Sequence, residues 1–421
     1  MDIKIKKISL VIVSIAVVGL IGSSIYYINN YNKSMNKPVI KTAKKITKED
    51  IEKYYSKYVK TKNYGIIYDS EYKEIGKVNK GIILTLDEVE ISENTLYFPF
   101  TFNNKVYNIS YKNLEPAKEP KENQKRYKHY VPFDESITTN DIYSIYKENK
   151  SIIKFHNGGI ELPIYIKEKD KYGVVINDEI YYIKKEDIKS TNYKKNSNMV
   201  KASRISTLLY HFIYDRKTEK CNQIICNSTD QVQSHIDYLK ENNFFTLTMD
   251  EFEMFIDKKL NVQKNSLLIT LDDGLFAMNA KKMFTDNKMN ISMFIVSSWF
   301  DPMTFVTDYV EVHSHTHNLH NAGACPTGQG GGIQCLSEEL IKKDLKTSRT
   351  KTNMTRALAY PFYEYNNYSI KLLKKVGFTL GFGGLYEGGS YKAYPGYNKF
   401  KIPRVTILNS TTVNDLRGAV N

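Results

Sequence analysis

Cysteine, tryptophan and proline are scarce in this chain of 421 residues, which contains four cysteines, one tryptophan and eleven prolines. No two cysteines form a C-x-x-C pair, so the common zinc-ribbon spacing is missing. There is no long acidic or proline-rich tract, and 41% of the residues are hydrophobic while 25% are charged. The composition is therefore that of a globular protein, and this length predicts two to four domains of about 100–200 residues each.

Acidic residues are fewer than basic ones: 46 aspartates and glutamates stand against 60 lysines and arginines, which gives a net charge of +14. Such a balance suits an anionic partner, or it reflects a lysine-rich composition with solvated side chains. The basic residues are spread along the whole chain, and we find no nucleic-acid-binding motif. The sequence thus predicts no nucleic-acid partner and favours a polymer of the cell wall or membrane surface.

Long apolar runs are missing except near the N-terminus, where residues 8–28 are uncharged and mostly hydrophobic. About 20 such residues span a bilayer, and the short basic segment before them favours a cytoplasmic N-terminus. We expect a cytoplasmic tip and transmembrane anchor at 1–28, a linker at 29–57, and a single pass through the cell membrane with the remainder of the chain outside. The alternative is a signal peptide cleaved near the small residues 22–24, which would give a secreted protein.

The four cysteines form two pairs that are close in sequence, Cys221 with Cys226 and Cys325 with Cys335. An oxidising compartment outside the cell permits a disulfide within each pair. A structural zinc site and free thiols are the alternatives. The flexible Gly-rich segment between Cys325 and Cys335 favours a bridge between these two residues.

Residues 58–190 show short β-rich runs broken by Gly, Asn and Asp, the pattern of small barrels. A weak internal repeat is visible, because two similar pairs of segments recur at similar spacing: 81–84 with 107–114, and 159–162 with 181–188. We interpret 58–120 and 121–190 as two β modules that resemble bacterial SH3-like wall-binding domains. Their role is either to bind cell-wall glycan or to act as spacers.

Residues 200–421 alternate between predicted strands and helices, which indicates a parallel sheet flanked by helices, either open or closed into a barrel. Thr248 and Glu251 have the spacing of a capping box at the start of one helix. We predict strands at 206–210, 244–248, 267–271, 291–296, 357–360 and 401–407. We predict helices at 229–241, 249–260, 277–287, 337–350 and 368–376.

Two motifs in this part indicate chemistry. Asp272 and Asp273 follow a buried strand and precede Gly274, and carboxylates are costly to bury without a partner. The segment 311–320 holds four of the eight histidines of the chain. A tight Asp-Asp-Gly turn would explain the first motif alone, but together they supply a His₂-Asp set that leaves a zinc ion an open coordination position.

These motifs resemble those of the polysaccharide deacetylases of carbohydrate esterase family four. Thr270-Leu-Asp-Asp-Gly274 is similar to their T-F-D-D-G motif, with Leu271 in place of Phe. Residues 205–408 resemble in particular the poly-N-acetylglucosamine deacetylases, through the following segments: 208–211, 237–244, 314–320 and 359–362. The resemblance implies a distorted (β/α) barrel that removes acetyl groups from N-acetylglucosamine in a cell-surface glycan.

The resemblance also implies residue roles. Asp272 would be the general base, and Asp273 would bind a divalent metal, most simply Zn²⁺. The subgroup pattern S-H-T-x-x-x-H gives His315 and His320 as the other ligands, which we favour, whereas the pattern of the wider family gives His313 and His317. His211 would be the general acid; the alternative is a histidine that only caps the end of a strand.

The third motif of the family is altered here. Its usual form is R-x-P-Y-G or W-P-Y-G, and residues 359–363 read Ala-Tyr-Pro-Phe-Tyr. No Arg is therefore expected to brace the base, and no Gly follows the aromatic residue. Pro361, Phe362 and Tyr363 would form the substrate and oxyanion contact, with a backbone N–H near Tyr363 as its donor.

Two other functions remain open from the sequence. One is a non-catalytic wall-binding protein, in which the β modules carry the function and the barrel is inert. The other is an esterase that removes O-acetyl groups from a polysaccharide. The sequence also leaves open whether the glycan is peptidoglycan or poly-β-1,6-N-acetylglucosamine.

Overall fold

The computed structural model of the chain describes residues 46–119, 122–384 and 392–421. The described residues fall into two compact units, 46–53 with 90–95, and 54–89 with the described residues from 96 to 421. Of the first unit, the short helix α2 (Lys48–Glu52) begins with a capping box between Thr47 and Asp50. The predicted membrane segment 8–28 lies outside the described residues, and no helix within them is long and apolar enough to cross a membrane.

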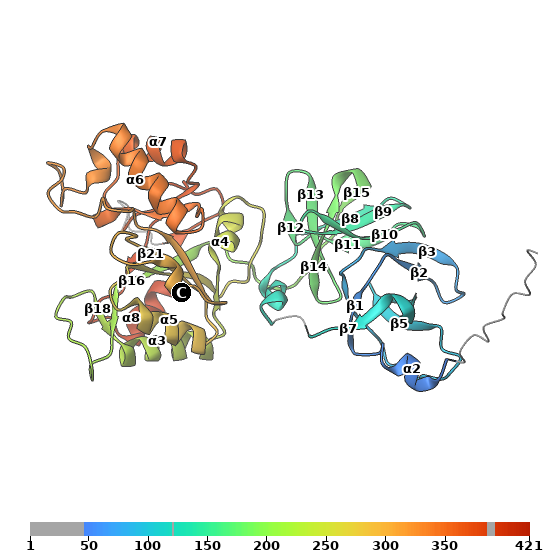
Figure 1. Cartoon of the computed structure of the whole chain (residues 1–421). Coiled ribbons are helices and arrows are strands. Elements are labelled where there is room, and N and C mark those ends of the chain that lie inside the picture. Colours follow the sequence, from blue (N-terminus) through green and yellow to red (C-terminus); the bar gives the residue numbers. More distant parts are fainter. Residues whose placement is uncertain (1–45, 120–121, 385–391) are drawn as a thin grey trace, which may run out of the picture. The chain divides into compact units, whose positions relative to one another are not determined.

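The second unit begins with two β modules of the same design (Figure 1). The first consists of β1 (Tyr58–Thr61), β2 (Gly65–Tyr68), β3 (Glu74–Val78), β4 (Ile83–Thr85), β5 (Tyr97–Phe102), β6 (Lys105–Ser110), the 3-10 turn η1 (Tyr111–Asn113) and β7 (Leu114–Pro116). The 3-10 segment η2 (Glu122–His129) leads to the second. This consists of β8 (Glu135–Thr139), β9 (Tyr143–Lys147), β10 (Lys150–Phe155), β11 (Glu161–Pro163), β12 (Ile166–Lys167), β13 (Lys171–Ile176), β14 (Glu179–Lys184), η3 (Lys185–Asp187) and β15 (Ile188–Tyr193).

Corresponding strands pair in the same way in the two modules. A small sheet has the order β4-β1-β7 in the first module and β11-β8-β15 in the second. In each module a 3-10 turn lies between the last two strands. The internal repeat inferred from the sequence therefore has a structural counterpart, and its segments 81–84 and 159–162 fall at β4 and β11. The strand pair β10–β3 joins the modules into one nine-stranded sheet. β15 continues to Tyr193, beyond the predicted boundary at 190.

The rest of the unit is built around a barrel of mainly parallel strands. These strands are β16 (Ile205–Tyr210), β20 (Ser266–Asp273), β21 (Ile291–Ile295), β22 (Val310–Ser314), β23 (Ala357–Ala359) and β24 (Leu380–Phe382), hydrogen-bonded in that order. A bridge between Phe382 and Ile402 leads from β24 to β26 (Val405–Thr406), which pairs with β16 and so closes the ring. β25 (Lys392–Ala393) is antiparallel to β16. The predicted distorted barrel is thus the observed fold, and all eight residues of β20 are buried at its centre.

Helices cover the outside of the barrel (Figure 1). They are α3 (Thr229–Glu241), α4 (Met249–Ile256), α5 (Ala277–Asp286), α6 (Glu338–Lys351), α7 (Asn367–Val376) and α8 (Val413–Val420). Each buries the apolar side chains of one face; in α3 these are Val232, Ile236 and Leu239. Burying each such side chain stabilises the fold by roughly 1.5–3 kcal/mol.

Several predicted elements are shorter in the structure. The helix expected at 249–260 begins with the predicted capping box but ends at Ile256. The strand expected at 401–407 is reduced to β26, and that expected at 244–248 is reduced to β19 (Phe245–Thr246). Apolar sequence extends beyond the hydrogen-bonded ladder in each case, because residues in loops beside the barrel are buried as well, as Leu260 and Ile407 show.

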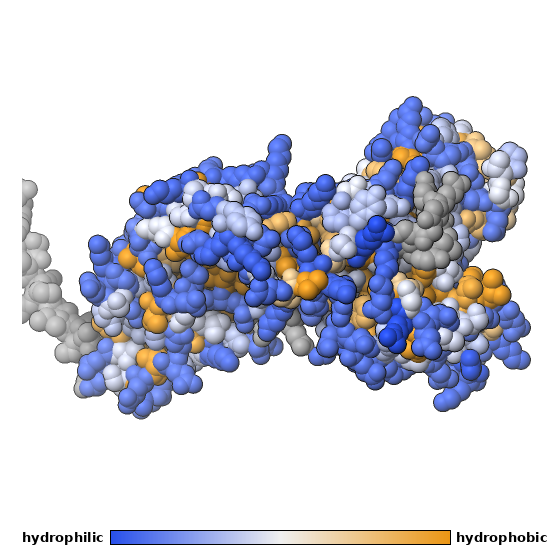
Figure 2. Space-filling model, turned by 180° about the vertical axis from the view of Figure 1, so that it is seen from behind, coloured by the Kyte–Doolittle hydropathy of each residue, from blue (hydrophilic) through white to orange (hydrophobic). Residues whose placement is uncertain are grey.

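The face shown in Figure 2 is mostly hydrophilic, and its hydrophobic residues form separate patches. Among the described residues that remain exposed is Trp299, 47% accessible, which is the single tryptophan of the chain. It lies just beyond the end of β21, on the side of the barrel where the Asp-Asp-Gly turn also lies.

Candidate active site at the carboxyl ends of the barrel strands

The Asp-Asp-Gly turn forms where β20 ends. Asp272 is 1% exposed and Asp273 is 8% exposed. The backbone of Asp273 has φ 74° and that of Gly274 has φ 117°, which turns the chain sharply away from the strand. A non-glycine residue in this region stores roughly 1–3 kcal/mol of strain, and such residues cluster at functional sites. A side chain at position 274 would collide with Phe300, so glycine is required there.

A buried arginine forms an ion pair with Asp272. Arg404, which is 0% exposed, donates through two nitrogens to the two carboxylate oxygens of Asp272, each at 2.7 Å. Its Nε donates to the Gly383 carbonyl oxygen at 2.7 Å. Burial raises the pKa of Asp272, but the charges of Arg404 and His315 lower it more, so the net shift is downward. The lowered pKa keeps Asp272 ionised, and an ionised carboxylate can accept a proton as a general base.

From the sequence, no arginine is expected beside the general base, and Arg404 shows that this expectation is wrong. The third motif does lack an arginine, but Arg404 takes that place from the segment that runs into β26. The sequence contains a cue, since Arg404 is a charged residue within a predicted apolar strand, and such a charge needs a buried partner.

Three possible metal ligands converge beside Asp272. Asp273 Oδ1 lies 3.3 Å from His315 Nε2 and 3.3 Å from His320 Nε2. The ligand atoms of the three residues all lie within 4.8 Å of one another. In a tetrahedral zinc site with bonds of about 2.0–2.1 Å, neighbouring ligand atoms are separated by about 3.3 Å. The structure thus brings together the set Asp273, His315 and His320 that the sequence favoured.

The protonation pattern of this cluster also suits a cation. His315 Nδ1 donates to the Ala359 carbonyl oxygen at 2.9 Å, and this bond orients the ring with Nε2 directed at Asp273. Asp273 Oδ1 is buried, and no hydrogen bond within the described part of the chain satisfies it. Burial lowers the pKa of His320, as does the charge of His315, to about 4. Burial lowers the pKa of His315, but the charges of Asp272 and Asp273 raise it more, so the net shift is upward. A divalent metal would replace the proton of His315 and bind the two imidazoles together with the unsatisfied oxygen of Asp273.

The alternative pair, His313 and His317, lies outside this cluster. His313 Nδ1 is 2.7 Å from Thr355 Oγ1, and its Nε2 is 3.3 Å from Glu311. His317 Nδ1 is 3.1 Å from Ser297 Oγ. The backbone N–H groups of His317 and Asn318 donate to Asp344 at 2.8 and 2.6 Å. These bonds fix the loop between His315 and His320, a role for Asp344 that no sequence motif indicates.

His211 lies at the end of β16, beside the two carboxylates. It is 7% exposed, and its Nε2 is 3.5 Å from the Tyr363 hydroxyl. Burial lowers the pKa of His211, the charges of Asp272 and Asp273 raise it, and the net shift is downward. The buried Nδ1 has no hydrogen-bond partner among the described residues. A strand-end histidine that only satisfied a backbone carbonyl would not leave this nitrogen unpaired.

The altered third motif forms a strained turn at the rim of the site. Phe362 has φ 55° and Tyr363 has φ 63°, although neither is a glycine. The N–H of Tyr363 donates to the Tyr360 carbonyl oxygen at 3.0 Å, so it is not available to an oxyanion. The expected donor near Tyr363 is therefore better assigned to the N–H of Phe362. The ring of Phe362 lies 4.4 Å from that of His320.

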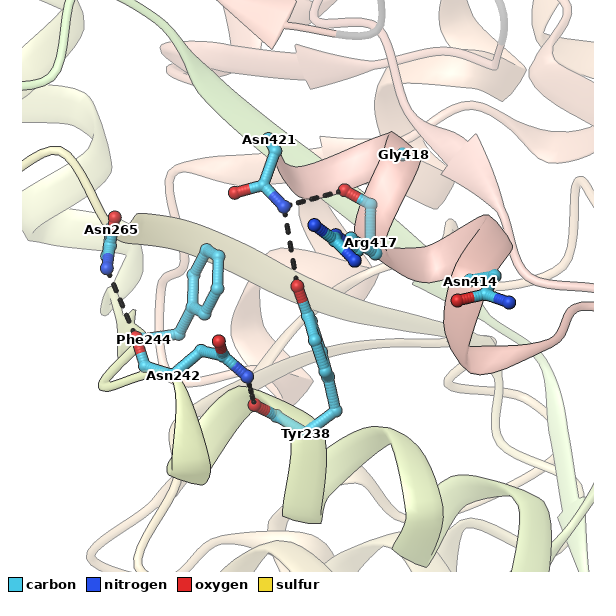
Figure 3. Close-up of a pocket in the computed structure, with 8 residues that line it drawn as sticks. All are labelled: Tyr238, Asn242, Phe244, Asn265, Asn414, Arg417, Gly418 and Asn421. Carbon is cyan, nitrogen blue, oxygen red and sulfur yellow. Dashed lines mark hydrogen bonds between the residues drawn. The ribbon is translucent and has the colours of Figure 1, made fainter.

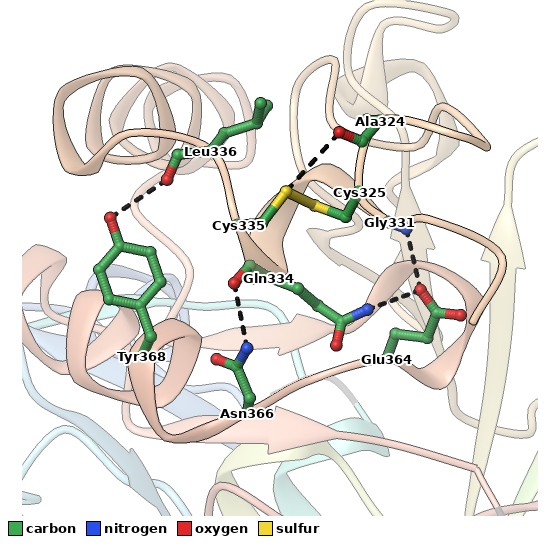
Figure 4. The surroundings of a disulfide bond; sticks show 9 residues. All are labelled: Ala324, Cys325, Gly331, Gln334, Cys335, Leu336, Glu364, Asn366 and Tyr368. Carbon is green, nitrogen blue, oxygen red and sulfur yellow. Dashed lines mark hydrogen bonds between the residues drawn. A yellow bond between two sulfur atoms is a disulfide. The ribbon is translucent and has the colours of Figure 1, made fainter. Parts of the chain in front are cut away.

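Both cysteine pairs are bonded, Cys221 to Cys226 and Cys325 to Cys335. The second bridge closes a Gly-rich loop that contains the short turn η5 (Gly332–Gln334). Figure 4 shows this loop beside Glu364, which directly follows the strained turn.

A separate pocket of about 700 Å³ lies at the opposite end of the barrel, near the start of β20 (Figure 3). Its eight lining residues are Tyr238, Asn242, Phe244, Asn265, Asn414, Arg417, Gly418 and Asn421. None of them is an aspartate, glutamate, histidine or cysteine. This pocket therefore lacks a set of metal ligands, and we assign the chemistry to the cluster at the other end.

Removing the arginine beside Asp272 should both destabilise the protein and weaken catalysis. In Arg404→Ala the buried carboxylate loses its partner, and we expect the free energy of unfolding to fall by about 3–5 kcal/mol. Urea unfolding of the variant and the parent measures this difference. The exposed Arg216→Ala is a matched control that should change it by less than about 0.5 kcal/mol. An Arg404→Ala variant as stable as the parent would show that the ion pair does not stabilise the fold.

Comparison with known proteins agrees with this geometry. Residues 259–381 match the family model described as polysaccharide deacetylase. The poly-β-1,6-N-acetyl-D-glucosamine N-deacetylase of Staphylococcus aureus (strain N315) is 28% identical over 244 residues, which are 52% of this chain and 81% of that protein. The range 259–381 matched by the family model includes the Asp pair, the three candidate ligands and the strained turn. His211 and Arg404 lie outside it.

Two solved structures align with parts of this chain. IcaB from Ammonifex degensii has a TM-score of 0.45 and 17% identity, over 53% of this chain and 99% of that one. BC0361, a polysaccharide deacetylase from Bacillus cereus, has a TM-score of 0.43 and 17% identity, over 80% of this chain and 99% of that one. The chain thus contains a polysaccharide deacetylase domain, and its named relatives are N-deacetylases, which are hydrolases that act on amide bonds.

Proposed function

We propose that this protein is a metal-dependent N-deacetylase that acts on a cell-surface polymer of N-acetylglucosamine. The observation that carries the proposal is the convergence of Asp273, His315 and His320 beside an ionised, arginine-paired Asp272. The family supplies the deacetylase reaction. The polymer is taken from the name of the Staphylococcus aureus relative. Peptidoglycan stays the alternative substrate, and a wall-binding role of the two β modules, as SH3-like domains, stays part of the proposal.

A divalent metal bound by the three ligands would polarise the acetyl carbonyl and lower the pKa of a water molecule. Asp272 would remove a proton from the attacking water, and its carboxylate lies within 3.9 Å of His315 Nε2 at the edge of the cluster. The Phe362 N–H would stabilise the negative charge that develops on the acetyl oxygen. Zn²⁺ fits the ligand set, which contains two imidazoles and one carboxylate.

His211 would donate a proton to the departing amine. Its resting pKa is lowered, so it is largely neutral before the reaction. As negative charge develops beside it, the ring would take up a proton from solvent, which the unpaired Nδ1 permits. It would pass one proton to the amine nitrogen as the C–N bond breaks, while the proton that Asp272 removes from water returns to solvent. The products would be acetate and a glucosamine unit with a positive charge at neutral pH.

The proposed location is the outer face of the cell membrane, with the protein anchored through residues 8–28 or secreted after cleavage. Both disulfides support export, because such bonds persist in oxidising compartments.

Mass spectrometry of two glycans tests the choice of substrate. Poly-β-1,6-N-acetylglucosamine and peptidoglycan are each incubated with the protein. The fragments are then examined for a mass loss of about 42 Da per removed acetyl group. We expect acetyl loss from the exopolysaccharide at a rate at least about tenfold above that from peptidoglycan. The reverse preference would make peptidoglycan the substrate, and loss of O-acetyl groups alone from either glycan would make the protein an esterase.

A further inference from the structure

The strained turn at the rim of the site needs an external support. Phe362 and Tyr363 both have positive φ, at 55° and 63°, where the usual motif of the family has a glycine after the aromatic residue. Glycine adopts this backbone region without steric cost, whereas phenylalanine and tyrosine persist there only if surrounding contacts hold them. Such contacts are provided on one side by the Tyr363 hydroxyl, which lies 3.3 Å from Thr406 Oγ1.

On the other side the turn is held by the disulfide-closed loop 325–335 (Figure 4). The carboxylate of Glu364 accepts hydrogen bonds from the backbone N–H of Gly331 at 2.9 Å and from the Gln334 side chain at 2.8 Å. It also accepts one from the backbone N–H of Gln329. A single side chain that directly follows the strained turn thus ties it to three points of the loop.

The loop itself is shaped to receive this carboxylate. Gly328 has φ 59°, and a side chain there would collide with Glu364 Oε1. A side chain at Gly331 would meet Glu364 Oε2 at 3.2 Å and the Phe362 ring at 3.4 Å. Within the loop, the Cys325 N–H donates to the Gly330 carbonyl oxygen at 3.0 Å. The glycines therefore allow the backbone to approach both the carboxylate and the ring.

From these contacts we infer that Glu364 is a positioning residue, and that with the loop 325–335 it forms a clamp that holds Phe362 in its catalytic orientation. This inference rests on the proposed function. Phe362 lies between the clamp and the metal cluster, because its ring contacts the Gly331 position on one side and lies 4.4 Å from the His320 ring on the other. The clamp therefore stabilises a backbone conformation that a glycine, as in the usual motif of the family, would adopt without steric cost.

Glu364→Ala tests the clamp by kinetics. Without the carboxylate the turn can relax, and the Phe362 N–H is displaced from the acetyl oxygen. A misplacement of about 1 Å costs up to about a hundredfold in rate, so we expect kcat to fall ten- to a hundredfold while KM changes less than about twofold. Glu364→Gln keeps one oxygen as an acceptor and should lose only about threefold. Metal content should equal that of the parent in both variants.

The matched control is Glu338→Ala. Glu338 lies in α6 and pairs with Lys342 and Lys375 at the surface, so it reports on the general effect of losing a carboxylate from this part of the molecule. Its kcat should stay within about twofold of the parent. The double variant Cys325→Ser/Cys335→Ser opens the loop and leaves the other disulfide intact. A chemical reductant would break both disulfides. The double variant should show the same kcat loss as Glu364→Ala.

Hydrogen exchange provides a readout that does not depend on activity. The N–H groups of Tyr363 and Glu364 donate to the carbonyl oxygens of Tyr360 and Pro361. In Glu364→Ala their exchange should be at least about tenfold faster, and in Glu338→Ala it should be unchanged. Parental kcat together with parental exchange in Glu364→Ala would overturn the clamp. An inactive parent protein whose Glu364→Ala variant still exchanges faster would overturn the proposed function but keep the clamp.

Discussion

Asp273→Asn and His320→Ala should each remove the metal and, with it, at least about a thousandfold of the deacetylase activity. Asp273→Asn replaces a carboxylate ligand by a neutral amide, and His320→Ala removes a ligand altogether. Asp273 Oδ1 lies 3.3 Å from the Nε2 atom of each of the two histidines. Loss of a ligand from a three-ligand catalytic site leaves too few donors to retain the ion. Metal analysis of the purified variants measures the stoichiometry, which should be about one ion per chain in the parent and close to zero in both variants.

His317→Ala is the matched control for this prediction, because His317 lies in the same loop and contacts Ser297 instead of the cluster. It should retain nearly the full metal content. If His317→Ala loses the ion while His320→Ala keeps it, the ligand set is His313 and His317, and the cluster described here is not the metal site.

His211→Ala should lower turnover of the amide substrate by at least about a hundredfold, since a positioned general acid contributes about 10²–10⁴ in rate. The metal content and the thermal midpoint should stay near those of the parent, because His211 Nδ1 makes no hydrogen bond with the described residues. An activated acetyl ester offers a distinguishing substrate. Its leaving group needs no proton, so the variant should lose less than about tenfold on it.

Kinetic comparison of the two substrates decides between the two roles of His211. A loss confined to the amide identifies the general acid. Equal losses on amide and ester, or a loss of metal, would make His211 a structural residue and move the acid elsewhere. Tyr363, whose hydroxyl lies 3.5 Å from His211 Nε2, would be the next residue to replace.

The barrel could be predicted from the sequence because its elements are encoded locally. The buried run that became β20 and the capping box of α4 are visible in short windows of sequence. The Asp-Asp-Gly turn follows from the same reasoning, since parallel strands end at a common edge where sites are built. The density of histidines in 311–320 then indicated which loop would face it.

The remaining site residues depend on contacts between distant parts of the chain. Arg404 lies 132 positions after Asp272, and Asp344 braces the histidine loop from α6. Neither stands in a local motif, so only the closed ring of strands places them. Glu364 was missed for a similar reason, because its partners are backbone N–H groups of the loop 325–335, which leave no trace in residue type.

The central claim is that this site hydrolyses acetamide bonds in a polymer of N-acetylglucosamine. Measuring released acetate and newly formed primary amines on poly-β-1,6-N-acetylglucosamine tests it most directly, with Asp272→Asn as the matched inactive variant. The account predicts acetate and amine in a ratio of about one to one for the parent, and a rate at least about a hundredfold lower for Asp272→Asn. Acetate without new amine, or equal rates for the parent and Asp272→Asn, would contradict it.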